Sequence, residues 1–181
     1  VATTSDTVYE GAEALSLSTT FNAAALKFAD RTGTDTTLRS GATASANSTI
    51  TDDGSGPDGD DPDGPSNPAD DDRPSLSVAG VTVDEGSTAV FTVTLNKALE
   101  ATTVIDLALA NVTTEAGDFN TTYTVYTNPA DKVGSALTVT ANQITLPAGA
   151  TTFYVAVATT SDTVYEGAEA LSLSTTFNAA A

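Results

Sequence analysis

Apolar and polar residues alternate along most of the chain, which is the pattern of β-strands that bury one face. In residues 91–95, Phe, Val and Leu alternate with Thr, and residues 105–109 show the same period of two. Similar segments are centred on residues 123–125, 137–139, 144–146, 153–157 and 171–173, and a closing strand is expected over 42–51. About eight short strands separated by Gly, Pro and Asn predict an all-β chain with a β-sandwich architecture.

A long internal repeat sets the organisation of the chain. Residues 1–25 recur letter for letter as residues 157–181, at an offset of 156 residues. An identity of this length indicates a tandem array of near-identical units, and one period fits a single domain with a linker. In the order of a unit, residues 74–181 come first and residues 26–53 complete it. The ends of this chain are therefore expected to fall inside a domain.

Three segments follow from this frame. Residues 1–53 are predicted to be the C-terminal strands of one repeat, and residues 74–181 the N-terminal and middle strands of the next. Residues 54–73 between them are rich in Asp, Pro and Gly and predict an extended linker. The sandwich must then be completed out of order, by a permuted monomer or by strand exchange between chains. Residues 29–41 and 128–134 are predicted to be long loops or excursions between strands.

The charge balance restricts the partners. Lys and Arg total 6 against 24 Asp and Glu, so the net charge is -18. Such a chain repels phosphate backbones and has no basic patch for an anionic membrane, and no apolar run approaches the ~20 residues of a membrane span. The chain contains no His and no Cys, and nothing in the surroundings of its lysines suggests an activated nucleophile, so we expect no enzyme activity.

Four acidic clusters lie where strands are expected to end. They are Asp84-Glu85, the segment from Glu115 to Asp118, the segment from Asp162 to Glu169, and Asp52-Asp53. Calcium takes about six to eight oxygen ligands, and carboxylates that converge without a cation repel one another. The clusters predict Ca²⁺ at one pole of the sandwich, and solvated acidic turns are the alternative for each cluster taken singly. Asp70, Asp71 and Asp72 are placed to share a cation with the next domain.

The order of these motifs resembles a known domain. SVAGVTVDEGSTAVFTVTL, TTEAGDF, ITLPAGATTFYVAV, the D-x-x-x-E-G of SDTVYEGAE and the closing STITDDG are similar to the Calx-beta domain of sodium/calcium exchangers. The resemblance covers residues 74–181 and 26–53, apart from the two predicted loops. It implies an Ig-like, calcium-binding β-sandwich, a domain that also occurs in tandem in large bacterial surface proteins.

The resemblance also implies a ligand set. By position, the calcium ligands are Glu85, Asp118, Asp162, Glu166, Asp52 and Asp53, and the copies of two of them are Asp6 and Glu10. Ser161 stands where the family often has the first Asp of a pair, and the closing run has two acids instead of three. These departures imply fewer or weaker calcium sites than in the exchangers.

Repetition and resemblance together predict a function. We expect a calcium-stabilised extender repeat of an extracellular adhesin on a bacterial surface, similar to the repeat regions of RTX-type biofilm adhesins. Its partners would be neighbouring identical repeats in the same polypeptide, and strand exchange would add a second chain. The alternative is that each repeat is itself a weak binding module for carbohydrate or ice, with repetition supplying avidity.

Overall fold

The computed structural model describes residues 4, 7–20, 27–29, 35–37, 43–56, 71–115 and 117–178, and for 27–29 and 35–37 it describes the backbone alone. These residues form strands and no helix, which confirms the all-β class. None of them makes a helix long and apolar enough to cross a bilayer. The chain divides into unit 1, residues 1–10 and 72–181, and unit 2, residues 11–71.

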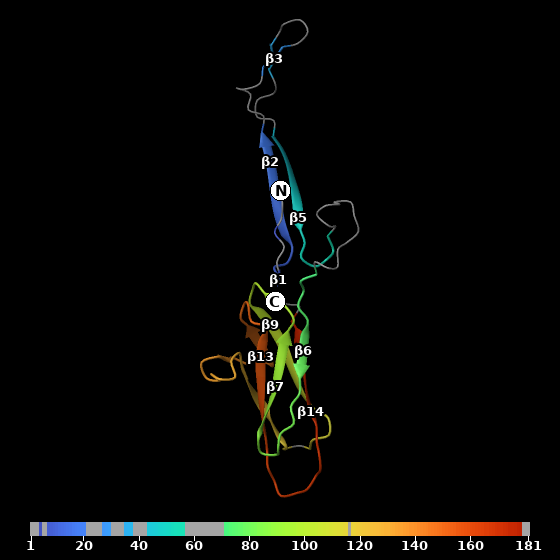
Figure 1. Cartoon of the computed structure of the whole chain (residues 1–181), viewed down its shortest axis with the longest axis vertical. Helices are drawn as coiled ribbons and strands as arrows, with labels where there is room; N and C mark the ends of the chain where they lie inside the picture. Colours follow the sequence, from blue (N-terminus) through green and yellow to red (C-terminus); the bar gives the residue numbers. More distant parts are fainter. Residues whose placement is uncertain are drawn as a thin grey trace. The chain divides into compact units, whose positions relative to one another are not determined.

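Unit 1 contains two larger antiparallel sheets (Figure 1). The first has the order β11 (Ala136–Leu137), β10 (Phe119–Tyr126), β13 (Thr152–Thr159), β7 (Thr88–Leu95), β6 (Leu76–Ala79). The second has the order β12 (Gln143–Leu146), β9 (Thr103–Asn111), β14 (Leu171–Phe177). A short parallel pair joins β1 (Val8–Tyr9) to β8 (Ala98–Leu99).

The residues that the alternation placed inward do form one core. Both sheets contribute to it, and its buried members include Phe91, Val93, Leu95, Ile105, Leu107, Tyr123, Val125, Ile144, Leu146, Phe153, Val155, Val157 and Leu173. Two sheets that cover each other with apolar faces are consistent with a β-sandwich. The Ig-like or Calx-beta type, and completion by permutation or exchange, stay predictions.

The predicted loop at residues 128–134 is a structured excursion. The Asn128 side chain accepts a hydrogen bond from the Ala130 N–H at 2.9 Å, and Asp131 Oδ1 accepts one from the Gly134 N–H at 2.7 Å. Lys132 Nζ lies 5.7 Å from the centre of the Tyr126 ring. Local side-chain acceptors and one cation–π contact therefore hold this loop against unit 1.

The described residues of unit 2 form two pairs of antiparallel strands. Strands β2 (Glu13–Thr20) and β5 (Thr43–Ile50) pair along eight residues, and β5 confirms the predicted closing strand. The predicted loop or excursion over 29–41 contains paired backbone, because β3 (Lys27–Ala29) pairs with β4 (Asp35–Thr37). Short segments of this kind satisfy their backbone groups by pairing with each other.

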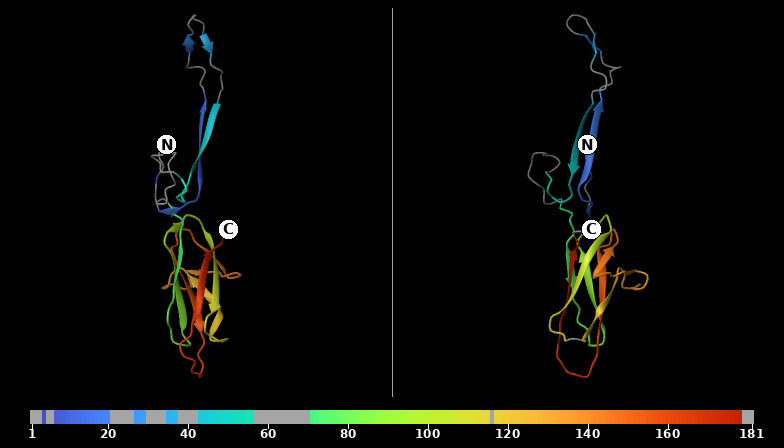
Figure 2. Two further views of the ribbon diagram at one scale, coloured as in Figure 1. Left: turned by 90° about the vertical axis from the view of Figure 1, so that its right-hand side faces the viewer. Right: turned by 180° about the vertical axis from the view of Figure 1, so that it is seen from behind.

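The repeated segment occurs in both units and meets two different environments. In unit 1 it forms the end of β13 and the whole of β14, and Leu173 is 8% exposed in the core. In unit 2 the same letters form β2, and the equivalent Leu17 is 66% exposed. Figure 2 shows β14 (red) within the sheets of unit 1 and β2 (blue) as part of a two-stranded ribbon. The second copy of the repeat enters unit 1 because it directly follows residues 152–156, which start β13. A short connection costs little loop-closure entropy, so it favours this copy over the first.

Candidate metal centre

Three loops meet at one end of unit 1, and backbone hydrogen bonds join them. The Thr159 N–H donates to the Ser87 carbonyl at 2.8 Å, and the Thr160 N–H donates to the Asp118 carbonyl at 2.7 Å. These bonds connect the turn before β7, the loop before β10 and the loop of residues 160–170 that leads into β14. The carboxylates on these loops are therefore carried by one framework.

The turn that carries Glu85 requires a glycine. The Ser87 N–H donates to the Asp84 carbonyl at 3.1 Å, and Gly86 has a φ of 77°. A Cβ at Gly86 would lie 2.9 Å from the Cβ of Ser161. Both the positive φ and this close approach exclude larger residues at Gly86, so the Asp-Glu-Gly motif is needed to bring its loop against the loop of Ser161.

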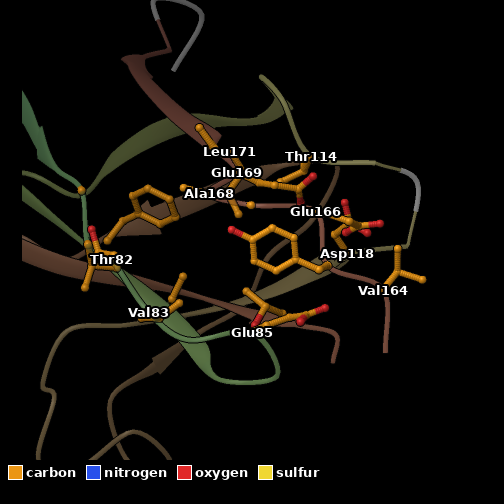
Figure 3. Close-up of a pocket in the computed structure, with 18 residues that line it drawn as sticks. Thr82, Val83, Glu85, Thr114, Asp118, Val164, Glu166, Ala168, Glu169 and Leu171 are labelled. Carbon is orange, nitrogen blue, oxygen red and sulfur yellow. The ribbon is translucent and has the colours of Figure 1, made fainter. Parts of the chain in front are cut away.

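Five carboxylates form two overlapping groups at this end. One oxygen each of Glu85, Asp162 and Glu166 lie within 4.8 Å of one another, and the same holds for Asp118, Glu166 and Glu169. In Figure 3, Asp118 and Glu166 lie on the same side of the pocket, and Glu85 lies below them. Glu166 belongs to both groups.

These separations fit a hard divalent cation. Oxygens about 2.3–2.6 Å from a calcium ion lie at most ~5 Å apart, so each group could share one ion. Magnesium would be a poorer fit, because it requires a shorter octahedral shell and loses its water reluctantly. Three carboxylates supply at most six oxygens, and backbone carbonyls or water would complete the shell.

Backbone donors orient the carboxylates. The Asp162 N–H donates to Glu85 Oε1 at 3.1 Å, and the Val164 N–H donates to Asp162 Oδ1 at 2.7 Å. The Glu115 N–H donates to Asp118 Oδ2. These bonds hold the side chains in place without neutralising their charge, so the positions of the negative groups are preset before a cation arrives.

The electrostatics of the cluster disfavour negative charge. Partial desolvation and then repulsion by Asp162, Asp118, Glu115 and Glu85 raise the pKa of Glu166 above its ordinary value. The pKa of Glu169 is also raised, first by desolvation and then by Asp118. A bound cation would reverse this repulsion, because it interacts favourably with the ionised form.

Four of the predicted ligands come together, and the structure adds a fifth residue. Glu85, Asp118, Asp162 and Glu166 lie in the two groups. Glu169 was not predicted as a ligand. The sequence did contain a signal for Glu169, which lies in the acidic run that ends two residues before β14. A loop that returns to a strand places several of its side chains at the same end of the sandwich.

The other predicted ligands are not in these groups. Asp52 and Asp53 belong to unit 2, where Asp53 Oδ1 accepts the Ser55 N–H at 3.0 Å. Glu10 follows β1, whose Tyr9 carbonyl accepts the Glu100 N–H at 3.4 Å, and it joins neither carboxylate group of the described residues. Asp6 lies outside the described residues.

The acids that were expected to share a cation at a junction have other settings. Asp72 is buried and forms an ion pair with Lys97. Asp71 pairs with Asp53 in an isolated antiparallel bridge, and Asp70 lies outside the described residues. The Lys97 ammonium already compensates the buried charge of Asp72, so this residue is a poor candidate for a calcium ligand.

A cavity of about 470 Å³ adjoins the carboxylates. Glu85, Asp118, Glu166 and Glu169 line one part of it, and its apolar lining is Val81, Val83, Ala89, Phe91, Val164 and Leu171. Thr82 and Val83 lie across the pocket from Asp118 in Figure 3. The size is that of a ligand-binding pocket and far exceeds the small voids of a close-packed core.

Comparison of the chain with protein-family models, curated proteins and solved structures finds no match.

Proposed function

We propose that this chain is a calcium-stabilised extender repeat of a large adhesin on a bacterial surface. Such repeats hold a terminal ligand-binding region away from the cell for attachment or biofilm formation. The observation that carries the proposal is the convergence of five carboxylates from three loops at one end of a unit that contains a repeated segment. A spacer benefits from many copies, whereas a catalytic domain rarely does.

The mechanism is electrostatic. At neutral pH the clustered carboxylates repel one another, as the raised pKa values of Glu166 and Glu169 indicate. Calcium offsets the repulsion and joins loops that precede β7, β10 and β14, so it restricts the end of the unit. In an array, stiffer ends would reduce the bending between neighbouring repeats.

Calcium is expected to lengthen an array. A protein with two or more joined units should show a larger maximum dimension in small-angle scattering with millimolar calcium than with EDTA, because restricted loops reduce bending between units. Replacement of both Asp52 and Asp53 by Asn should weaken the response if these acids act at the junction. An equal or smaller dimension with calcium would contradict the extender mechanism.

One observation favours a second candidate, a binding module for carbohydrate. Tyr165 is 96% exposed in the loop of residues 160–170, and it lines the cavity beside the carboxylates. An exposed aromatic ring next to a cation site can stack on a sugar while the cation binds hydroxyl groups. Many weak sites in an array would then act by avidity.

The repeated segment offers a matched control for this candidate. A glycan array probed with the chain in calcium should show binding that the Tyr165→Ala substitution removes. Tyr9 is the identical residue of the first copy and lies in β1, so Tyr9→Ala should leave that binding unchanged. A chain that binds no glycan, or one that binds equally well after Tyr165→Ala, would exclude the tyrosine as a sugar platform.

A further inference from the structure

Strand β14 ends its sheet, so one of its edges carries no partner strand among the described residues. On its other edge the Ala170 carbonyl accepts the Val112 N–H at 3.1 Å, and the Asn178 N–H donates to the Val104 carbonyl at 2.9 Å. Backbone groups of alternate residues point to opposite edges of a strand. Residues 171, 173, 175 and 177 therefore direct their N–H and carbonyl groups to the open edge.

The identical segment in unit 2 identifies a candidate strand for this edge. Strand β2 pairs with β5 in a continuous register, in which Leu15 lies opposite Ser48 and Leu17 opposite Ala46. Leu171 and Leu173 are the same residues in the second copy of the repeat. Because strand pairing depends on backbone groups and facing side chains, β14 can take β5 in the register that β2 uses.

The two faces of β5 fit this position. Ala44, Ala46, Ser48 and Ile50 share the face of Leu15 and Leu17, whereas the opposite face carries Thr43, Ser45, Asn47 and Thr49. Next to β14, the apolar face would point to the core with Leu173, and the polar face would point to solvent with Ser172 and Ser174. In unit 2, residues 43–49 are exposed, so the apolar face is not used there.

The cavity of unit 1 lies where Ile50 would be delivered. In unit 2, Ile50 lies opposite Glu13, which is the equivalent of Glu169. Residues 168–171 line the cavity together with Val81 and Phe91. Ile50, the only large apolar side chain of β5, would thus lie beside this cavity.

We propose that the open edge of β14 is a strand-addition site that accepts β5 from a second copy of this chain. Strand β5 would leave β2 and pair with β14, which has the same sequence as β2, so few backbone hydrogen bonds are gained or lost. The driving force is the burial of Ile50, Ala46 and Ala44 against unit 1.

A second copy is a better donor than the same chain. Asp53 pairs with Asp71, and Asp71 directly precedes Asp72, which is bound to Lys97 at the end of β7. In the proposed register, the residues after Ile50 run toward the opposite end, where Glu85 precedes β7. Donation within one chain would break the bridge between Asp53 and Asp71, whereas donation to another copy leaves it intact.

One consequence rests on the proposed function. Asp52 and Asp53 lie two and three residues after Ile50, and strand addition would bring them to the carboxylate end of the acceptor unit. Strand addition would thereby supply predicted calcium ligands that unit 1 lacks, and calcium would favour the exchanged form. The strand-addition site itself requires no cation.

Mixed disulfide formation tests the proposal, because the natural chain has no cysteine. Ser45 and Ser174 would face each other at the new ladder, both on the solvent side. Chains carrying S45C are mixed with chains carrying S174C in EDTA and oxidised, and the heterodimer is measured by mass. We expect about tenfold more heterodimer than with S45C and S172C, because diagonal neighbours lie ~7–8 Å apart, too far for an unstrained disulfide.

Three further results make the test decisive. The double variant S18C/S45C locks the hairpin within one chain when it is oxidised, since Ser18 lies opposite Ser45 in unit 2. The oxidised chain should therefore form no dimers by strand addition, and dimers that persist would contradict the proposal. If S45C/S174C gives only internal disulfides, β5 of the same chain is the occupant and the proposal is wrong. Equal heterodimer with S172C and S174C would show random thiol contact and would also overturn it.

Two more measurements guard against misfolded variants and separate the role of calcium. The cysteine-free natural chain is expected to form dimers in analytical ultracentrifugation. The single substitution Ala46→Pro in that chain should abolish them, because proline removes a hydrogen-bond donor in the middle of β5. Dimers that persist in this variant would contradict strand addition. More heterodimer in calcium than in EDTA supports the link to the metal centre, whereas equal yields contradict that link alone and leave the strand-addition site standing.

Discussion

Replacement of Leu173 by alanine is expected to lower the free energy of unfolding of unit 1 by about 2–5 kcal/mol. Leu173 is nearly buried in the core shared by the two sheets, and truncation would leave a cavity beside β9. The midpoint of thermal unfolding, followed by circular dichroism, should fall by on the order of 10 °C.

The same substitution at Leu17 is the matched control. The two leucines occupy identical sequence surroundings, but Leu17 is 66% exposed, so its loss should change the unfolding free energy by less than about 0.5 kcal/mol. Comparable losses at both positions would mean that the first copy of the repeat also enters a core. A large loss at Leu17 alone would mean that the first copy fills unit 1 in place of the second.

Calcium is expected to stabilise unit 1, and Glu166→Gln to remove most of that gain. At ~100 times the dissociation constant, one filled site adds about 2.7 kcal/mol, or on the order of 10 °C in the unfolding midpoint. Glu166 belongs to both carboxylate groups, so a neutral side chain there weakens both. In EDTA the same variant should unfold at a higher temperature than the natural chain, because one of the repelling charges is gone.

The opposite signs in the two buffers distinguish a metal ligand from a merely structural residue. Glu10→Gln is the control, since Glu10 is the same residue of the first copy and lies in neither carboxylate group of the described residues. This variant should keep the full response to calcium. Equal midpoints in calcium and EDTA for the natural chain would refute the metal centre, and an undiminished response in Glu166→Gln would remove this residue from it.

The fold class was open to prediction because it depends on a local signal. Residues such as Phe91, Val93, Ile105 and Phe153 alternate with polar neighbours, and a period of two buries one face wherever the strand is placed. The pairing β3–β4 was missed because segments of three residues are too short to show a period.

The candidate site was predictable where the acids lie on loops that directly border core strands. Glu85 and Asp118 precede β7 and β10, and Asp162 and Glu166 follow β13, so the core fixes the end of the unit on which they lie. Asp52 and Asp53 follow β5, which pairs with β2 in unit 2. Glu169 was missed because a ligand role depends on the path of a loop, which alternation does not describe.

The sequence by itself determined that the chain is all-β, that one segment occurs twice, and that carboxylates gather at strand ends. These properties follow from residue type and spacing, which act over a few positions. Only the tertiary structure decided that Leu173 is buried while Leu17 is exposed, that Glu169 joins Glu166, and that β14 has one edge without a partner strand among the described residues. Two segments of identical sequence have the same intrinsic propensities, so the difference in their burial depends on the strands that precede and flank them. Those contacts exist only once the sheets have formed.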